Sequence, residues 1–313
     1  MINFFVFLYL CLPKLPVVRS LPLVSRGVRG GVRLSANWLL RLWFFFSRPF
    51  MSSGVDSNER FVVSLTSFPA RINTVHLCIE TLLRQERKPK SIVLWLSLDQ
   101  FSDKRSLPKS LLSQEKRGLK IVLREGDLRS HKKYFYAFEE YRDSLVLTVD
   151  DDVLYSSKLT EDLFRASTRN PGWIVGNQVK KIAVRNGEIL PYLDWVSFLC
   201  GGANTVNIPV GVGGVLYPPG VLCKEFRRAE ILMRLAPKAD DLWLGVWAMY
   251  SSVPVVPSGK EELEQIPLTI FSDQTLFSSN GLGGNDVQLN DILNWGVVTL
   301  GRDLKREIIL KNS

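Results

Sequence analysis

The sequence passes from an apolar, β-branched run into three adjacent carboxylates at Leu145-Val146-Leu147-Thr148-Val149-Asp150-Asp151-Asp152. The apolar part, residues 145–149, predicts a buried strand. Adjacent carboxylates repel one another, and removing them from water is costly unless a cation or a proton intervenes. A hard divalent cation with oxygen ligands meets that need. We therefore interpret residues 150–152 as a metal site at the C-terminal edge of an α/β sheet, where such folds bind ligands. A solvated acidic turn is the alternative.

The composition is that of a globular protein with a sizeable core. The chain has 313 residues, of which 46% are hydrophobic, enough for one large α/β domain or two small ones. Its four scattered cysteines and two histidines form no CxxC or Cys/His cluster, so a zinc site or a disulfide framework finds no support. Seven of the 40 basic residues and none of the 31 acidic residues lie in residues 1–50. The nearly neutral remainder argues against a nucleic-acid enzyme with a basic cleft.

The basic segment also contains two apolar patches, residues 1–12 and 38–46. The first is too short to span a bilayer and lacks the basic start of a signal peptide. The second contains Arg41 and is followed by Arg48, and a mixture of aromatic residues and arginines suits anionic headgroups. We predict a cytoplasmic protein attached peripherally to the cytoplasmic face of the inner membrane. Packing of the patches on the catalytic domain is the alternative.

Strand and helix patterns alternate after a polar linker at residues 51–58. Strands are expected at residues 60–65, 91–96, 119–123 and 145–149, and helices at 72–84, 109–114, 133–141 and 159–168. This alternation predicts a parallel, doubly wound sheet. Further on, the sequence predicts a loop or tight strand-turn at 211–214, helices at 242–250 and 287–294, and a glycine-rich loop at 280–286. We divide the chain into a basic apolar segment with linker, 1–58, a catalytic domain, 59–300, and a C-terminal tail, 301–313.

Five motifs occur in an order similar to that of a known group of enzymes. They are Ser-Leu-Thr-Ser-Phe-Pro-Ala-Arg at 64–71, Asp-Leu-Arg-Ser-His-Lys-Lys at 127–133, the triplet at 150–152, the glycine- and proline-rich run at 211–220, and Ala-Asp-Asp-Leu-Trp at 239–243. Over residues 60–295 the chain resembles bacterial nucleotide-sugar glycosyltransferases of the GT-A fold, family 2-like, of surface polysaccharide synthesis. The resemblance implies a single catalytic α/β domain of the GT-A type, with a Rossmann-like, mostly parallel sheet flanked by helices.

The resemblance also implies an activity and a cofactor. The enzyme would be a hexosyltransferase that moves a sugar from a nucleotide-sugar, UDP-linked by preference, to a saccharide or lipid-linked saccharide acceptor. The triplet would be its "DXD-type" motif, with Asp152 binding Mn²⁺ or Mg²⁺ directly. Asp150 would bind the metal through water or contact the ribose or sugar, and Asp151 would orient its neighbours.

The remaining donor-binding residues follow from the same motifs. Thr66, Pro69 and Arg71 would hold the nucleotide at the end of the first strand, although Arg71 could equally be a surface arginine. Asp127 would touch the base, or instead serve as a turn residue. The pair Lys132 and Lys133 would face the diphosphate, with a solvated basic pair as the alternative. The glycines of the 211–214 segment, Gly213 and Gly214 among them, would let the backbone approach the donor sugar.

An inverting transfer needs a carboxylate that deprotonates the acceptor hydroxyl. Asp241 or Asp240 at the start of the 242–250 helix is our candidate, with Asp241 preferred, because the helix dipole favours an ionised carboxylate there. Capping of that helix is the alternative. The rings of Tyr192, Trp195 and Trp243 could stack on sugars, and residues 281–284 with Asn285 and Asp286 could form a lid or a plain turn.

Two other classes of function remain open. A nucleotidyltransferase would also place metal-binding aspartates on an α/β sheet, but it should carry a basic, glycine-rich nucleotide loop, and residues 64–71 contain no glycine. A non-catalytic nucleotide-sugar-binding protein would need no base at residues 240–241. A P-loop phosphoryl-transfer enzyme is disfavoured because no GxxxxGK[ST] motif occurs.

Overall fold

The computed structural model describes residues 1–221, 224–268 and 283–312. Its central sheet has the order β11-β6-β10-β4-β1-β2-β3, with β9 paired to β6. Strands β1 to β4 are parallel, β10 is antiparallel to both β4 and β6, and β11 is parallel to β6. The predicted mostly parallel sheet is therefore confirmed. The strands of this sheet are β1 (Phe61–Thr66), β2 (Ser91–Ser97), β3 (Leu119–Arg124), β4 (Leu145–Thr148), β6 (Ile174–Lys181), β9 (Val196–Phe198), β10 (Asn207–Tyr217) and β11 (Val255–Pro257).

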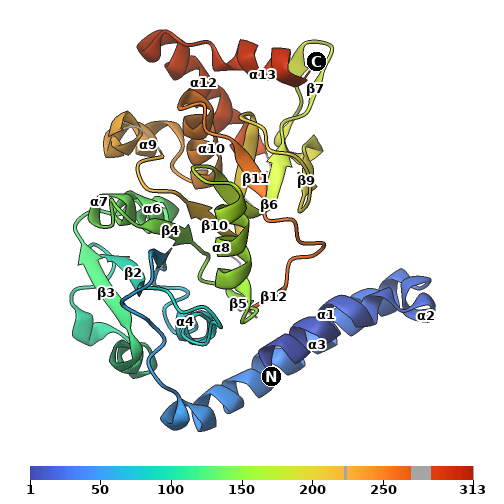
Figure 1. The fold of residues 1–313 in the computed structure, drawn as a ribbon, viewed down its shortest axis with the longest axis vertical. Coiled ribbons are helices and arrows are strands. Elements are labelled where there is room, and N and C mark those ends of the chain that lie inside the picture. Colours follow the sequence, from blue (N-terminus) through green and yellow to red (C-terminus); the bar gives the residue numbers. More distant parts are fainter. Residues whose placement is uncertain (222–223, 269–282, 313) are drawn as a thin grey trace.

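Helices cover both faces of this sheet because its central strands are apolar on both sides (Figure 1). Phe61, Val63 and Leu65 of β1 pack in one core with helices α4 and α8, whereas Val62 packs on the other face with Ala137. A further core joins β6 and β10 to the C-terminal helices. The helices of this domain are α4 (Val75–Leu82), α5 (Lys109–Leu112), α6 (Lys132–Phe135), α7 (Ala137–Glu140), α8 (Leu159–Arg169), α9 (Ala229–Leu235), α10 (Asp240–Tyr250), α12 (Asn285–Leu300) and α13 (Leu304–Asn312).

Four features differ from the sequence-based expectations. The 133–141 helix is two short helices, α6 and α7. Residues 211–214 lie inside the long strand β10, whose pairing with β6 is irregular between Val210 and Val215. Helix α10 begins at Asp240, so both aspartates belong to its first turn. Residues 304–312 of the expected C-terminal tail form helix α13, whose Leu304 and Ile308 are buried in the core with α10 and α12. Small ladders pair β5 (Val153–Tyr155) with β12 (Gln265–Pro267) and β7 (Val184–Arg185) with β8 (Glu188–Ile189).

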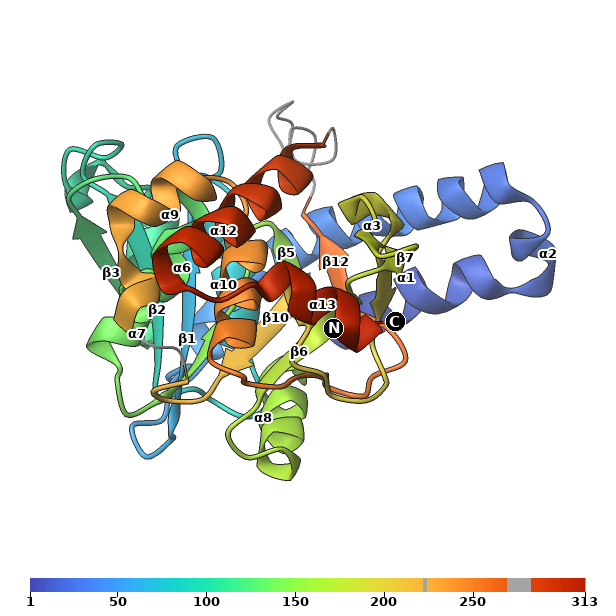
Figure 2. The ribbon, with the colours of Figure 1, turned by 90° about the horizontal axis from the view of Figure 1, so that it is seen from above.

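The basic N-terminal segment forms a helical hairpin that projects from the sheet domain (Figures 1 and 2). It consists of α1 (Ile2–Cys11), the short α2 (Pro16–Arg19) and the 26-residue α3 (Pro22–Ser47). The Asn3 side-chain amide donates to Ser157 Oγ at 2.8 Å, and that of Asn37 donates to the Pro267 carbonyl at 3.2 Å. The hairpin therefore contacts the domain through α1 and the second half of α3, and Lys14 near its turn also pairs with Glu262. No helix within the described ranges has both the length and the apolarity needed to cross a bilayer.

Candidate functional site

The three carboxylates that follow β4 point to different partners. Asp150 Oδ1 accepts from Lys133 Nζ at 2.8 Å. Asp151 is buried, and its oxygens accept from Ser67 Oγ at 2.6 Å and Arg71 Nη1 at 2.7 Å. Asp152 Oδ2 lies 3.1 Å from the same Arg71 nitrogen, and a third of the Asp152 side chain stays exposed. The repulsion within the triplet is thus relieved by two built-in cations, and a solvated acidic turn does not describe it.

Lys133 ties the triplet to the start of α10. Its ammonium lies 2.9 Å from Asp240 Oδ2 as well as 2.8 Å from Asp150 Oδ1, and only 5% of its side chain is exposed. Burial disfavours the charged lysine, but Asp150 and Asp240 outweigh burial and raise its pKa well above the ordinary value. The alternative of a solvated basic pair is therefore wrong. Lys133 is a fixed charge at the junction of β4 and α10.

Asp241 lies at the same junction, where its carboxylate contacts the backbone of β10. Both its carboxylate oxygens accept from the Gly211 N–H, each at 3.0 Å. A methyl group on Gly211 would lie 3.0 Å from Asp241 Oδ1, 3.2 Å from Lys133 Nζ and 3.6 Å from Asp150 Oδ1. A side chain at position 211 would therefore crowd these three charged groups. Helix capping does not occupy the two aspartates, because the N-cap position is Ala239 and no side chain caps α10.

The pKa values of the two aspartates of α10 are shifted in opposite directions. Burial opposes ionisation of Asp240, but Lys133 and His131 outweigh it and lower the Asp240 pKa. Burial, and then the negative charge of Asp240, raise the pKa of Asp241 to about 8. A carboxylate with its pKa near neutrality is suited to accept a proton during a reaction.

The raised pKa of Asp241 predicts a pH-dependent difference in stability. The folded protein favours the protonated form of Asp241. The stabilisation that this carboxyl group contributes to the folded state is therefore fully present below its ordinary pKa of 3.8 and is lost as the pH rises through about 8. Asp241→Asn mimics that protonated form at every pH. We expect the difference in melting temperature, variant minus natural protein, to increase between these two pH values and to stay constant at higher pH. A difference that stays constant from pH 4 to pH 9 would contradict the assignment.

Asp127 and Lys132 form a separate group farther along the sheet edge. Asp127 Oδ1 accepts from the Arg129 N–H at 2.9 Å and from Lys132 Nζ, and Oδ2 accepts from Gln100 Nε2 at 2.7 Å. Lys132 is buried, and its ammonium group forms an ion pair with Asp127. The turn role weighed for Asp127 is thus present. Gln100 Oε1 is buried beside it and has no hydrogen-bond partner among the described residues. The sequence did not point to this acceptor.

The other predicted site residues lie as follows. Thr66, at the end of β1, donates to the Trp95 carbonyl at 2.8 Å, and Pro69 is exposed nearby. Gly213 and Gly214 have φ of +94° and +90°, and methyl groups there would lie 2.8 Å from Leu263 and 3.3 Å from Leu147. These two glycines therefore turn toward packed side chains, while Gly211 faces the carboxylates.

Of the three rings considered for sugar stacking, two are part of the core. The indole N–H of Trp195 donates to the Leu190 carbonyl, that of Trp243 donates to the Phe226 carbonyl, and both rings are buried. Tyr192 is half-buried, and burial followed by the charges of Asp241 and Asp240 raises its pKa. Tyr192 is thus the ring close to the aspartates. The Tyr192 N–H also donates to Asp286 Oδ1 at 2.7 Å, whereas Gly281 and Leu282 of the expected lid lie outside the described residues.

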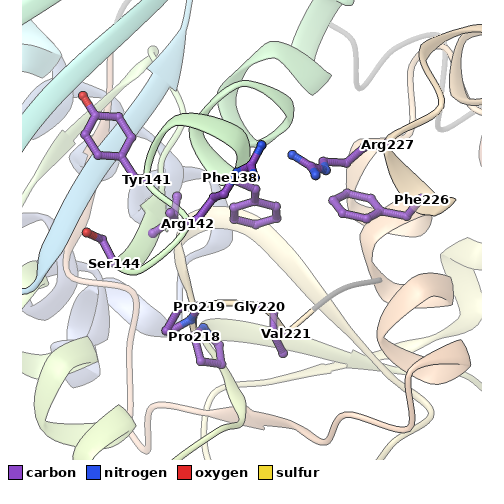
Figure 3. A pocket seen from close by; sticks show the side chains of 11 residues that line it. Phe138, Tyr141, Arg142, Ser144, Pro218, Pro219, Gly220, Val221, Phe226 and Arg227 are labelled. Carbon is purple, nitrogen blue, oxygen red and sulfur yellow. The ribbon is translucent and has the colours of Figure 1, made fainter. Parts of the chain in front are cut away.

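A cavity of about 330 Å³ lies away from this site (Figure 3). Its walls include Phe138, Tyr141, Pro218 and Phe226. Val146 also lines the cavity. Val146 lies near the start of β4, where it pairs with Tyr217, whereas Asp150 follows the end of that strand. The cavity therefore opens at the opposite edge of the sheet from the carboxylates.

Asp150 and Asp152 are the carboxylates that could bind a divalent cation. Within the described ranges, no group of three or more His, Cys, Asp or Glu side chains is placed to hold a metal. Asp152 and Asp150 each keep about a third of their side chain exposed. Burial, and then the charge of Asp150, raise the Asp152 pKa to about 6 despite Arg71. Both carboxylates are paired with a cation but still partly exposed, so their oxygens could bind a Mg²⁺ or Mn²⁺ ion whose other ligands come from phosphate and water.

No known protein family is matched by the sequence, and no curated protein matches it. Some solved structures are similar to it at low sequence identity. The mannosyltransferase PcManGT of Pyrobaculum calidifontis, in complex with GDP-Man and Mn²⁺, is 13% identical at a TM-score of 0.43, over 79% of this chain and 69% of that one. Residues 1–349 of S. aureus TarS, in complex with UDP-GlcNAc, are 14% identical at 0.48, over 81% and 71%.

A third matching structure belongs to another class of enzyme. The 4-diphosphocytidyl-2C-methyl-D-erythritol synthase of Anaerococcus prevotii is 13% identical at a TM-score of 0.43, over 73% of this chain and 97% of that one. At such low identities and TM-scores, the likeness does not assign an activity. The case for a function therefore depends on the side chains of the site.

Proposed function

We propose that this protein is a metal-dependent glycosyltransferase. It transfers a sugar from a nucleotide-sugar, UDP-linked by preference, to a hydroxyl of a saccharide or lipid-linked saccharide acceptor in surface polysaccharide synthesis, with inversion. The observation that carries the proposal is the Asp241 carboxylate. It is held at the carboxyl edge of a mostly parallel sheet, next to the residues after β4, with a pKa near neutrality. A binding protein would have no use for such a base.

In the proposed reaction, Asp241 accepts the proton of the acceptor hydroxyl as its oxygen attacks the anomeric carbon. A bond forms between that oxygen and the carbon, and the bond from the carbon to the diphosphate oxygen breaks with its electron pair leaving on the diphosphate. A Mn²⁺ or Mg²⁺ ion held by Asp152 and Asp150 would supply charge neutralisation for the diphosphate. Arg71 keeps Asp151 and Asp152 in place, and Lys133 holds Asp150 next to Asp240.

A thermal-shift screen tests the donor and cofactor. The full chain is heated with UDP-, GDP-, CMP- and dTDP-sugars, each with and without Mn²⁺. Ligand at about a hundred times its Kd stabilises the folded state by roughly 2.7 kcal/mol, which moves the melting temperature by several degrees. We expect a shift with one nucleotide-sugar, dependent on Mn²⁺, followed by sugar transfer to an acceptor. Pyrophosphate release from a nucleoside triphosphate would instead identify a nucleotidyltransferase, and binding without transfer to any acceptor would favour a binding protein.

Asp152→Asn is expected to abolish the metal-dependent part of that shift. The variant keeps the size of the side chain but loses the charge that would bind the cation. Asp143→Asn is a matched control, because Asp143 is exposed next to the cavity at the opposite edge of the sheet. A metal-dependent shift of normal size in Asp152→Asn, with the control unchanged, would remove Asp152 from the metal site.

A further inference from the structure

The outer side of α3 is an apolar surface with no partner among the described residues of the sheet domain. Trp38, Leu42 and Phe45 recur at intervals of four and three residues, so they share one side of the helix. Their exposed fractions are 70%, 49% and 70%. The side of α3 formed by Ala36, Leu40 and Phe44 is buried against the rest of the protein. The helix therefore packs along one side and presents large apolar side chains on the other.

The rest of the hairpin adds to this exposed surface. Phe4 and Phe7 of α1, three residues apart, are 58% and 60% exposed. The turn between the helices contributes further exposed apolar residues, and so do neighbouring positions of α3. We call all of these the outer apolar surface of the hairpin: Phe4, Phe7, Leu15, Val17, Leu21, Leu23, Leu34, Trp38, Leu39, Leu42, Phe45 and Phe46. In Figures 1 and 2 the hairpin projects from the sheet domain, with the turn at α2 at its outer end.

Charge identifies the kind of partner. Residues 1–50 contain no acidic residue. Within the described part of the chain, Lys14 pairs with Glu262 and Arg48 with Glu80. Four exposed arginines of the hairpin form no ion pair with any described acidic residue: Arg19, Arg26, Arg29 and Arg41. The partner is therefore both apolar and negatively charged.

We propose that the outer apolar surface docks the protein on an anionic lipid bilayer, with the hairpin lying in the plane of the headgroups. Aromatic residues and arginines on one amphipathic helix suit that interface. α3 is not a spanning helix, because it carries four arginines and three glycines. A second copy of the chain would bring two uncompensated sets of arginines together, so charge favours lipid over self-association. This docking is independent of the proposed sugar transfer.

Vesicle flotation of the full chain tests the docking. The vesicles consist of phosphatidylcholine alone, or with about a quarter of phosphatidylglycerol. We expect binding to the anionic vesicles, weakened by salt, and little binding to the neutral ones. Trp38→Ser/Phe45→Ser/Phe46→Ser should lower the partition coefficient at least tenfold. Val298→Ser/Leu310→Ser is the matched control, since both residues are exposed on α12 and α13, and it should bind as the natural chain does.

A second variant tests the charges. Replacing Arg19, Arg26, Arg29 and Arg41 with glutamine should weaken binding to anionic vesicles by about fivefold per arginine near the surface. Unchanged melting temperatures would show that both variants fold. Equal flotation of the natural chain and the Trp38, Phe45 and Phe46 variant would overturn the proposal. So would a natural chain that ignores vesicles and elutes as a dimer, if the same variant elutes as a monomer, because the surface would then be a self-interface.

Discussion

Asp241→Asn is expected to lower the turnover number by about 100- to 10,000-fold, the usual contribution of a positioned general base. Asparagine keeps the shape of the side chain and an oxygen that accepts from the Gly211 N–H, so the junction of β10 and α10 should persist. It cannot take the proton of the acceptor hydroxyl. Donor binding does not use that proton. The metal-dependent thermal shift with the donor should therefore be the same as for the natural protein.

Asp240→Asn is the comparison that separates the two aspartates. Asp240 lies 2.9 Å from Lys133, and its pKa is lowered, so it is a poor proton acceptor. Its replacement should reduce stability while retaining more turnover than Asp241→Asn. The measurement is single-turnover transfer at saturating donor, with melting temperatures recorded for both variants. Normal transfer by Asp241→Asn together with loss of transfer in Asp240→Asn would make Asp240 the base.

The sheet could be predicted because its signal is local. Residues 145–149 are apolar at every position but Thr148, and the observed strand is Leu145–Thr148, buried except at its first residue. β2 was predicted at 91–96, and all seven residues of Ser91–Ser97 are buried. Central strands of a parallel sheet are covered on both faces, so each needs a continuous apolar run, and such runs are visible in a single sequence.

The pairing of the charged side chains could not be predicted, because the partners are distant in sequence. Lys133 was expected to face a diphosphate, yet it is held between Asp150 and Asp240. Arg71 was expected at the base or phosphate, yet it binds Asp151 and Asp152. In both cases the residue lies next to the carboxylates that follow β4. Its partner depends on how the strand ends converge, and local pattern does not contain that information.

Gly211, the glycine that faces the carboxylates, was predicted as part of the 211–214 segment but not singled out, for a different reason. In a regular strand, Gly211 and Gly213 would lie on the same face. The shift in pairing between Val210 and Val215 breaks that alternation, so Gly213 turns toward Leu263 while Gly211 meets Asp241. The two alternatives for the N-terminal segment were membrane attachment and packing on the catalytic domain. One side of α3 packs and the opposite side is exposed, so packing leaves a surface on which membrane attachment stays a prediction.

Lys133→Met is expected to destabilise the protein by ~3–5 kcal/mol, the usual result of removing one member of a buried ion pair. Methionine fills much of the space of the lysine stem but leaves Asp150, Asp240 and Asp241 without the cation between them. Lys132→Met is the matched control, since Lys132 is equally buried. Its partner Asp127 is a quarter exposed and keeps bonds from Gln100 and Arg129, so the loss should be smaller. Chemical denaturation of both variants measures the difference.

The pH dependence of Lys133→Met separates loss of charge from loss of packing. Without Lys133 the carboxylates it contacts would hold their protons more tightly in the folded state than in the unfolded state. The variant should then be most stable at low pH, and its deficit relative to the natural protein should grow as the pH rises from about 4, the ordinary pKa of an aspartate. Adding Asp240→Asn should restore part of the stability by removing one uncompensated charge. A deficit that is the same at pH 5 and pH 9, and that Asp240→Asn does not reduce, would mean that Lys133 contributes packing rather than charge. Asp150 and Asp240 would then be stabilised by solvent, and the raised pKa of Asp241 would lose its explanation, since that explanation requires the junction to be shielded from water.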